Sequence, residues 1–357
     1  MSGSPLSSRG AGDDLYQIGT ATASATQLAR YRVKVVVTGA AGFIGAALAR
    51  ALAARAELSD AQDHASSIRR LVLADRALPE GHASDPRIEA ISGDIADPAF
   101  VSGLIDADTR VVFHLAGVMS GASESDFALG MRVNLDGTRN VFEACRALPA
   151  PARLVYTSSI GVFGAPLPPR VDDQTPQWPT LSYGAQKRAC EILLDDYSRR
   201  GFLDGRALRL PGVVVRPRLP NRALSAFNSD LIREPLAGRA YTVPLGPEAV
   251  VWLMSAGRCV ANLVHAALLP AQAIGSRRAL NLPCVVASIG EIVAAIGRAA
   301  GADAAARVGY APDAKLQAQF GGWPRDFHPG RALALGFAAD ASIDAIVRGH
   351  LAAPGPG

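Results

Sequence analysis

The 357-residue sequence contains no apolar run of the roughly 18 residues that a membrane-spanning helix needs. Its Lys and Arg residues are scattered and form no basic stripe interleaved with aromatics, so the net charge of +4 does not indicate a nucleic-acid partner. The hydrophobic share of 49% and the charged share of 19% are typical of a folded globular chain. We therefore expect a soluble protein without a membrane or nucleic-acid partner.

Cysteine is also scarce, and no two cysteines have the C-x-x-C spacing of a metal or redox site. The cysteines are Cys145, Cys190, Cys259 and Cys284, and the six histidines add no ligand cluster to them. We expect no metal, and reduced thiols in a cytoplasmic protein. Residues 1–31 lack the apolar core of a signal peptide and the Arg-rich face of a transit peptide, so we expect a flexible N-terminal extension there.

From Arg32 onward, short β-branched runs alternate with segments rich in Ala, Leu and Arg. The runs are "RVKVVV", "RRLVLAD", "RIEAIS", "RVVFHLA" and "ARLVYTS". This alternation predicts an α/β fold, a doubly wound parallel sheet with helices on both faces. Ligands bind such sheets at the carboxyl ends of the strands, where the strand order reverses.

Three glycines interrupt the first strand and the Ala-rich helix that follows it. Gly39, Gly42 and Gly45 have the spacing G-x-x-G-x-x-G, a variant of the common dinucleotide fingerprint G-x-G-x-x-G. The free N–H groups and the positive end of the next helix favour a phosphate at this junction. The alternative is a tight turn with close helix packing and no ligand.

The second strand ends at Asp75, thirty residues after Gly45, although about 20 is usual for the acid that binds a cofactor ribose. We attribute the excess to a loop insertion, "RAELSDAQDHASSIRR". A carboxylate here accepts hydrogen bonds from both ribose hydroxyls and repels a 2′-phosphate, which favours NAD over NADP. Arg76 weakens that preference, and Asp75 could instead cap a turn.

Tyr183 and Lys187 are four residues apart in "SYGAQKRACEILLDDYSRR", which predicts a helix that opens near Ser182. That spacing puts both side chains on one face, where an ammonium group can stabilise a phenolate. A tyrosine with a lowered pKa can act as a base near neutral pH. The alternative is an ordinary surface pair.

Taken in order, these motifs resemble those of the extended short-chain dehydrogenase/reductase superfamily, also called the NAD-dependent epimerase/dehydratase family. The resemblance runs from Arg32 to near the C-terminus. It is carried by "TGAAGFIG", "LVLAD", "GDIAD", "VFHLAG", "VNLDGT", "YTSSIGVFG", "SYGAQK" and "RLPGVVVRP". It implies a Rossmann-type NAD domain at 32–212 that returns near 246–280, with a smaller substrate-binding region at 213–245 and 281–357.

The resemblance also implies roles for individual residues. Ser159 would hold the reacting oxygen, Tyr183 would be the acid/base, and Lys187 would anchor the ribose. Asn134 could join a proton relay, although a helix-capping or helix-bending role is the alternative. The expected cofactor-binding residues are Gly39, Gly42, Phe43, Ile44, Gly45, Asp75, Asp94, Ile95, Leu115, Ala116, Gly117, Tyr183, Lys187 and Pro211. A homodimer formed through the helices near 123–147 and 181–201 is expected on the same ground.

A finer resemblance is to the branch of this superfamily that oxidises D-erythronate and related sugar acids at the C2 hydroxyl with NAD. It implies a small sugar-acid substrate whose carboxylate faces an arginine of segment 213–245, since a guanidinium can donate two parallel hydrogen bonds. The expected substrate-binding residues are Ser120, Ser159, Ser225, Arg222 and Arg233. Trp252 and Phe227 are expected to pack in the core or a lid.

Three other functions use the same fold. A nucleotide-sugar 4-epimerase or dehydratase would keep the same catalytic residues but needs a larger substrate region. A reductase of apolar carbonyls would prefer NADP, which Asp75 disfavours. A dinucleotide-sensing protein without activity would usually have a broken catalytic set, whereas the set here is complete.

Overall fold

A computed structural model describes residues 32–55, 57–59, 65–78, 85–218, 225–320 and 322–352, which belong to one compact unit that begins at Arg32. The expected N-terminal extension at 1–31 lies outside these described residues. Each described helix is too short or too polar to cross a bilayer. The same residues hold no cluster of three or more His, Cys, Asp or Glu side chains placed to bind a metal ion.

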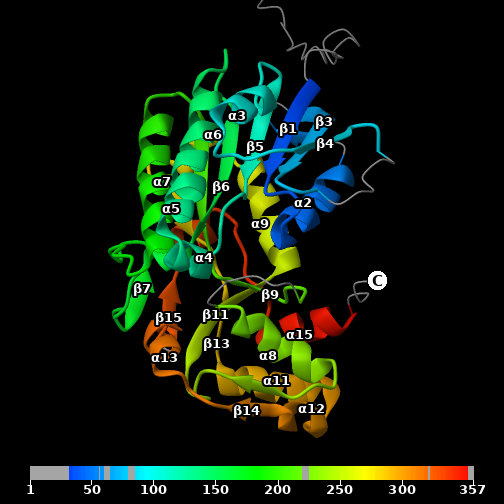
Figure 1. Cartoon of the computed structure of the whole chain (residues 1–357), viewed down its shortest axis with the longest axis vertical. Helices are drawn as coiled ribbons and strands as arrows, with labels where there is room; N and C mark the ends of the chain where they lie inside the picture. The colour runs from blue at the N-terminus through cyan, green and yellow to red at the C-terminus, as the bar shows by residue number, and fades with distance from the viewer. Residues whose placement is uncertain are drawn as a thin grey trace, which may run out of the picture. The chain divides into compact units, whose positions relative to one another are not determined.

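The central element is an eight-stranded sheet with the order β12-β8-β6-β5-β1-β3-β2, in which β4 also pairs with β3 (Figure 1). Its strands are β1 (Arg32–Thr38), β2 (Glu57–Ser59), β3 (Ala65–Asp75), β4 (Ile88–Ser92), β5 (Thr109–His114), β6 (Arg153–Ser159), β8 (Asp204–Leu210) and β12 (Ala279–Asn281). All of these pairs are parallel except β2 with β3. The chain builds outward from β1 through β3 and β4, then crosses to β5, so the strand order reverses between β1 and β5. The predicted doubly wound α/β fold is confirmed.

Helices cover both faces of this sheet (Figure 1). The helices of one face are α2 (Phe43–Ala53) and α9 (Ala256–Leu268), and those of the other are α3 (Pro98–Leu104), α6 (Gly137–Arg146) and α7 (Ser182–Arg199). Alternate residues of β1 serve the two faces, because Val35 and Val37 pack in the α2/α9 core and Val36 packs in the other. The apolar β-branched run "RVKVVV" therefore forms a central strand that is buried on both faces.

The expected loop insertion after α2 is wrong in part, because much of it is strand. β2 pairs antiparallel with the first residues of β3, and β3 already pairs with β1 at Ser67. The polar composition of this segment suggests a loop, but a backbone can pair with a neighbouring strand whatever its side chains are.

The expected long helix near 123–147 is also interrupted. The chain forms α4 (Ser120–Ser125), α5 (Phe127–Gly130), the π-helical turn η1 (Met131–Asp136) and then α6. The side chain of Asp126 accepts a hydrogen bond from the N–H of Leu129 and so caps α5. The π turn is a form that recurs at functional sites.

A second group of strands and helices packs beside the carboxyl edge of the sheet, in the lower part of Figure 1. A three-stranded sheet joins β9 (Gly212–Val214), β11 (Val250–Ser255) and β13 (Val285–Ser288). Its helices are α8 (Phe227–Leu236), α11 (Ile289–Ala300), α12 (Ala302–Ala306), α13 (Ala314–Phe320) and α15 (Ile343–Ala352). Short elements complete the description: η2 (Ile160–Val162), β7 (Arg170–Asp172), β10 (Tyr241–Val243), α10 (Ala271–Ile274), β14 (Val308–Tyr310), β15 (Asp326–His328) and α14 (Gly330–Ala334). Phe227 and Trp252 are buried in this region, as expected.

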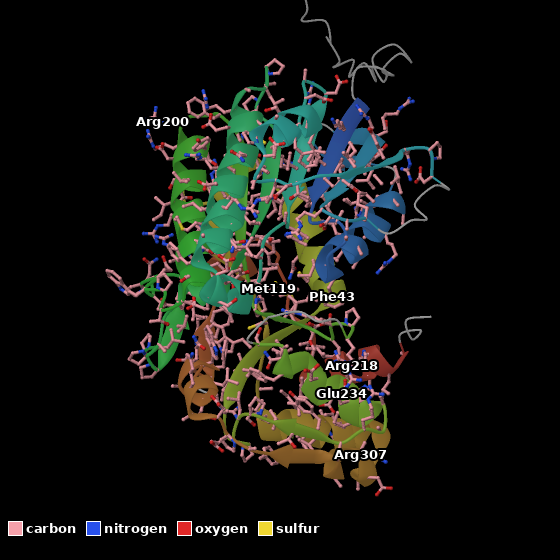
Figure 2. The ribbon with its side chains drawn as sticks, viewed as in Figure 1. Phe43, Met119, Arg200, Arg218, Glu234 and Arg307 are labelled. Carbon is pink, nitrogen blue, oxygen red and sulfur yellow. The ribbon has the colours of Figure 1, made fainter. Side chains whose placement is uncertain are left out.

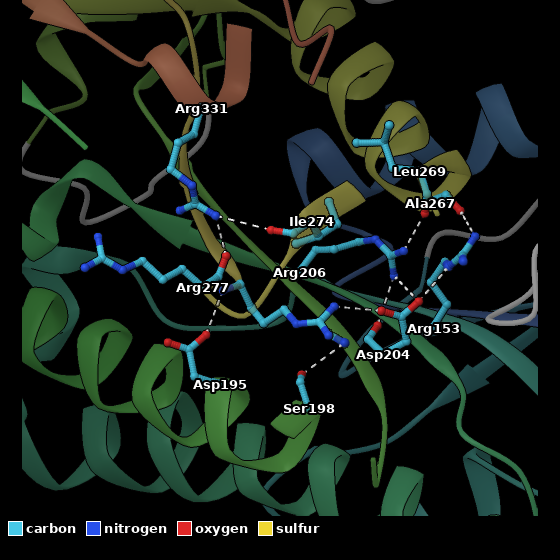
Figure 3. Close-up of polar contacts among 12 residues, drawn as sticks. Arg153, Asp195, Ser198, Asp204, Arg206, Ala267, Leu269, Ile274, Arg277 and Arg331 are labelled. Carbon is cyan, nitrogen blue, oxygen red and sulfur yellow. Dashed lines mark hydrogen bonds and ion pairs between the residues drawn. The ribbon is translucent and has the colours of Figure 1, made fainter. Parts of the chain in front are cut away.

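Buried arginines of β6 and β8 hold the C-terminal end of α9 against the sheet (Figure 3). Arg153 and Arg206 are fully buried, and their guanidinium groups lie 3.2 and 2.8 Å from the carboxylate of Asp204. They also donate to the carbonyls of Ala267 and Leu269, at the C-terminal end of α9, which attracts cations. We therefore assign this cluster a structural role, which is to hold α9 against β6 and β8.

Candidate active site

The glycine turn brings the first turn of α2 against the ends of β1 and β5. Gly39 has φ of +74°, and a Cβ added there would lie 2.6 Å from the backbone N of Ala116. A Cβ at Gly45 would lie 2.0 Å from the carbonyl oxygen of Gly39. Both positions thus exclude any side chain. The result is a helix N-terminus held at the point where the strand order reverses, which is a site for a phosphate.

A cavity of about 570 Å³ lies at this point. Eleven of the expected cofactor-binding residues line it: Gly39, Gly42, Phe43, Ile44, Gly45, Asp75, Asp94, Ile95, Leu115, Ala116 and Gly117. The other three, Tyr183, Lys187 and Pro211, line an adjoining cavity of about 190 Å³. Val118 and Met119, which follow Gly117 and belong to no motif, line both cavities as well.

Asp75 was expected either to bind the cofactor ribose or to cap a turn, and its contacts are compatible with both roles. Its Oδ2 accepts a hydrogen bond of 2.9 Å from the N–H of Ala41, and its Oδ1 accepts one of 2.7 Å from the N–H of Arg76. These turn contacts fix the carboxylate at the wall of the larger cavity. Each oxygen keeps a further lone pair, so the fixed carboxylate can still receive two ribose hydroxyls.

Ser159, Tyr183 and Lys187 line the smaller cavity together. Ser159 is the last residue of β6, and its Oγ accepts a hydrogen bond of 3.0 Å from the N–H of Gly161. Tyr183 and Lys187 both lie on α7, which begins at Ser182 as predicted. Lys187 Nζ donates a hydrogen bond of 2.8 Å to the carbonyl oxygen of Thr157. A strand end and one helix face thereby bring a hydroxyl, a phenol and an ammonium group to one wall.

The electrostatics of Tyr183 differ from the expectation. Burial raises the pKa of its phenol, whereas the guanidinium of Arg216 and a hydrogen bond from Ser159 lower it. Burial also lowers the pKa of Lys187 to about 8, against the opposing effects of Cys190 and Glu191. Arg216 is thus a cation beside the phenol in addition to Lys187, whose Nζ lies 5.7 Å from the centroid of the Tyr183 ring. Lys187 directs its ammonium at Thr157.

Asn134 lies in the π turn and ties the loop after β5 to α7. Its Oδ1 accepts a hydrogen bond of 2.8 Å from the N–H of Val118, and its Nδ2 donates one of 2.8 Å to Oε1 of Gln186. A Cβ on Gly117 would lie 2.9 Å from the same Oδ1. Asn134 therefore shapes a loop that borders both cavities.

The expected substrate residues divide into three groups. Ser120, Ser159 and Ser225 line the smaller cavity. Arg222 lies outside the described residues. Arg233 was expected to bind the substrate, but it does not line this cavity. Its guanidinium contacts Asp230 and Glu234 and donates to the carbonyl of Arg216.

The substrate cavity and the surface that carries the ion pairs of α8 are separate in the side-chain view. Figure 2 shows Phe43 and Met119 at the lower end of the sheet, and Arg218 and Glu234 beyond them in the region of α8. Arg218 lies 3.5 Å from Glu234 with most of its side chain exposed, so it belongs to the ion pairs of that surface.

Comparison with known proteins agrees with this geometry. Residues 35–265 match the model of the NAD dependent epimerase/dehydratase family. D-erythronate dehydrogenase of Cupriavidus necator is 47% identical over 89% of this chain and 98% of its own length. D-erythronate dehydrogenase of Haemophilus influenzae is 34% identical over 88% and 98%. A crystal structure described as a nucleoside-diphosphate-sugar epimerase from Agrobacterium tumefaciens is 37% identical, with a TM-score of 0.83 over 90% of this chain and 94% of that one.

The glycine turn, the fixed Asp75 carboxylate and the larger cavity fit NAD, which is the cofactor of the matched family. The chain belongs to the NAD-dependent epimerase/dehydratase family.

Proposed function

We propose that this NAD-dependent dehydrogenase oxidises the C2 hydroxyl of a small sugar acid of the D-erythronate type to the 2-oxo acid. The observation that carries the proposal is the convergence of Ser159, Tyr183 and Lys187 on one small cavity beside the cofactor cavity. The two D-erythronate dehydrogenases that align with nearly the whole chain support the substrate class.

Each of the three residues has a distinct task in this reaction. Ser159 donates its hydroxyl hydrogen to the reacting oxygen and holds it next to Tyr183. The Tyr183 phenolate accepts the proton of the substrate hydroxyl as that oxygen becomes a carbonyl. Lys187 is held by Thr157 at the boundary of both cavities, where its remaining N–H groups can hold the cofactor ribose. NAD, when bound, supplies the acceptor for the hydride that leaves the carbinol carbon.

The size of the site favours a small substrate. The cavity of about 190 Å³ is smaller than the roughly 300–1,000 Å³ of pockets that enclose drug-sized ligands. Part of its wall, including Ile44, Leu115 and Pro211, consists of residues that are expected to bind the cofactor. The remaining space suits a four-carbon acid better than a nucleotide sugar.

A second candidate is a nucleotide-sugar 4-epimerase or dehydratase. The similar structure from Agrobacterium tumefaciens carries an epimerase description, which favours it. The small cavity opposes it, because the sugar must turn over between two half-reactions. A reductase of apolar carbonyls that uses NADP is opposed by the Asp75 carboxylate at the ribose end of the cavity.

One assay separates these functions. The purified protein is incubated with NAD and, separately, with D-erythronate, other aldonates, nucleotide sugars and aromatic alcohols, and the absorbance of reduced nicotinamide is followed. We expect turnover with the aldonates alone. Interconversion of nucleotide sugars without net reduction of NAD, detected by chromatography, would support the epimerase instead. The homodimer expected from the sequence stays a prediction, which light scattering of the same sample tests.

A further inference from the structure

Arg216 is a half-buried arginine that enters the substrate cavity directly after β9. Its Nε donates to the carbonyl of Val213 at 3.2 Å, and its backbone N–H donates to Ser229 Oγ at 3.1 Å. Its own carbonyl accepts a hydrogen bond of 2.6 Å from Arg233. The residue is therefore held from β9 on one side and from α8 on the other. Arg233, which we expected to bind the substrate, helps to hold it.

Arg216 has no carboxylate partner among the residues that the structure describes. Its neighbours Arg218, Arg233 and Arg239 all contact Glu234, and Arg233 also contacts Asp230. An unpaired charge out of water is unfavourable, and burial accordingly lowers the pKa of Arg216. An anion in the cavity would relieve this cost, and the planar guanidinium suits a carboxylate.

The position of Arg216 limits where that anion can be on the substrate. Arg216 lines the same cavity as Ser159 and Tyr183, and it is close enough to Tyr183 that each shifts the pKa of the other. An anion bound by Arg216 in this cavity would therefore be close to the carbon that carries the reacting hydroxyl. A 2-hydroxy acid meets this condition, whereas the diphosphate of a nucleotide sugar is many bonds away from the reacting sugar carbon.

A second polar group faces the same cavity. Asn228, on α8, is 6% exposed and lines the cavity, and its side-chain Oδ1 has no hydrogen-bond partner among the described residues. A Cβ on Gly212 would lie 3.1 Å from Asn228 Nδ2, so the glycine leaves room for this amide. Buried amide groups without partners are uncommon in proteins, and here the free group borders a ligand cavity.

We propose that Arg216 binds the substrate carboxylate and that Oδ1 of Asn228 accepts a hydrogen bond from the substrate hydroxyl beside it. The inference rests on the proposed function, and it identifies the residues that make the enzyme specific for an acid. Arg216 also borders the cofactor cavity, so a contact to the cofactor is the competing role.

The test compares an acid with its neutral counterpart. We would measure kcat/KM for D-erythronate and for its amide, and the Kd of reduced cofactor by fluorescence, in the unmodified enzyme, Arg216→Gln, and the control Arg218→Gln in the same segment. In Arg216→Gln we expect a loss of roughly a hundredfold or more on the acid, a much smaller loss on the amide, and unchanged cofactor affinity. Arg218→Gln should behave like the unmodified enzyme, because its side chain is mostly exposed.

Asn228 gives a second, independent variant. Asn228→Asp puts a carboxylate into the same cavity, where it competes with the substrate for Arg216. We expect it to raise KM for the acid more than Asn228→Ala does, with little difference between the two variants on the amide. Thermal melting would establish that each variant is folded.

The other outcomes also decide the question. Equal losses on acid and amide in Arg216→Gln would make Arg216 a structural residue, and a weakened cofactor Kd with an unchanged preference for the acid would make it a cofactor contact. Either result overturns the inference while the proposed function stands. If the unmodified enzyme oxidises neither the acid nor its relatives, the proposed function fails and the inference fails with it.

Discussion

Glu191 accepts two hydrogen bonds from the guanidinium of Arg209, at 2.9 and 2.8 Å, and both side chains are buried. Glu191 lies on α7 one turn after Lys187, and Arg209 lies on β8. The same carboxylate accepts a hydrogen bond of 2.6 Å from Ser158, the neighbour of Ser159. The Glu191 carboxylate thus joins α7, which carries Tyr183, to β8 through Arg209 and to β6, which carries Ser159, through Ser158.

Removal of one partner of this pair should destabilise the protein strongly. Glu191→Ala leaves the Arg209 charge buried and unpaired, and we expect the free energy of unfolding to fall by about 3–5 kcal/mol. Urea denaturation followed by circular dichroism measures the change. The exposed pair of Arg199 and Asp196 provides the control, since Arg199→Ala should change the midpoint little. Equal midpoints for Glu191→Ala and the unmodified protein would contradict the role of this pair.

Tyr183→Phe should abolish turnover and leave cofactor binding intact, because only the oxygen that accepts the proton is removed. Lys187→Ala should reduce both turnover and cofactor affinity. The measurements are steady-state rates with D-erythronate and fluorescence titration with reduced cofactor. Substantial turnover by Tyr183→Phe would remove Tyr183 from its proposed role. A Lys187→Ala enzyme with normal affinity would assign the ribose to another group.

Asp75→Ala should weaken the use of NAD and narrow its advantage over NADP. The ribose hydroxyls lose their acceptor and a 2′-phosphate loses the repulsion of the carboxylate. The N–H groups of Ala41 and Arg76 lose their acceptor as well, so the turn itself should loosen. The comparison is kcat/KM for NAD and for NADP in both proteins. An unmodified enzyme that used the two cofactors equally would contradict this role of Asp75.

His114 should make the fold sensitive to acid. Burial, together with the charge of Lys187, lowers its pKa from 6.5 to about 3, and its ring contacts the hydroxyls of Thr38 and Thr138 at 2.7 and 2.9 Å. Between these two pH values the unfolded chain binds a proton at His114 and the folded chain does not, so stability falls as the pH falls through this window. The loss should be on the order of a few kcal/mol.

The variant His114→Gln isolates this contribution, because an amide can contact both threonines and does not titrate there. Its free energy of unfolding should fall less steeply between neutral and acidic pH than that of the unmodified protein, as urea titrations at several pH values would show. Identical slopes for His114→Gln and the unmodified protein would refute the assignment.

Local sequence patterns predicted the parallel sheet and the common position of Tyr183 and Lys187, because the geometry of both follows from residue spacing. The i, i+4 spacing of Tyr183 and Lys187 fixes their shared helix face, and the glycine spacing fixes the turn before α2. The choice among the arginines was not predictable in this way. Which guanidinium remains unpaired depends on where α8 puts Asp230 and Glu234, although the proximity of both acids to Arg233 in the sequence was a clue.

Asn228 had no sequence motif, and its proposed role rests on its place in the cavity wall and on its Oδ1, which has no hydrogen-bond partner among the described residues. The π turn at Asn134 was likewise missed, because an insertion of one residue in a helix leaves the apolar pattern on either side intact. The strand at the start of β3 was missed because its partner is the backbone of β1, which side-chain composition does not report.

The separate packing of α8 has a practical consequence for engineering. Phe227, Leu231 and Ile232 anchor this helix in the core of the C-terminal region, whereas α7 rests on the core of the parallel sheet. Substitutions at Asn228, the residue of α8 that lines the smaller cavity, should therefore leave the core beneath Tyr183 and Lys187 unaltered. The residue proposed to select the substrate and the residues proposed to transfer the proton are thus carried by helices that pack in different cores.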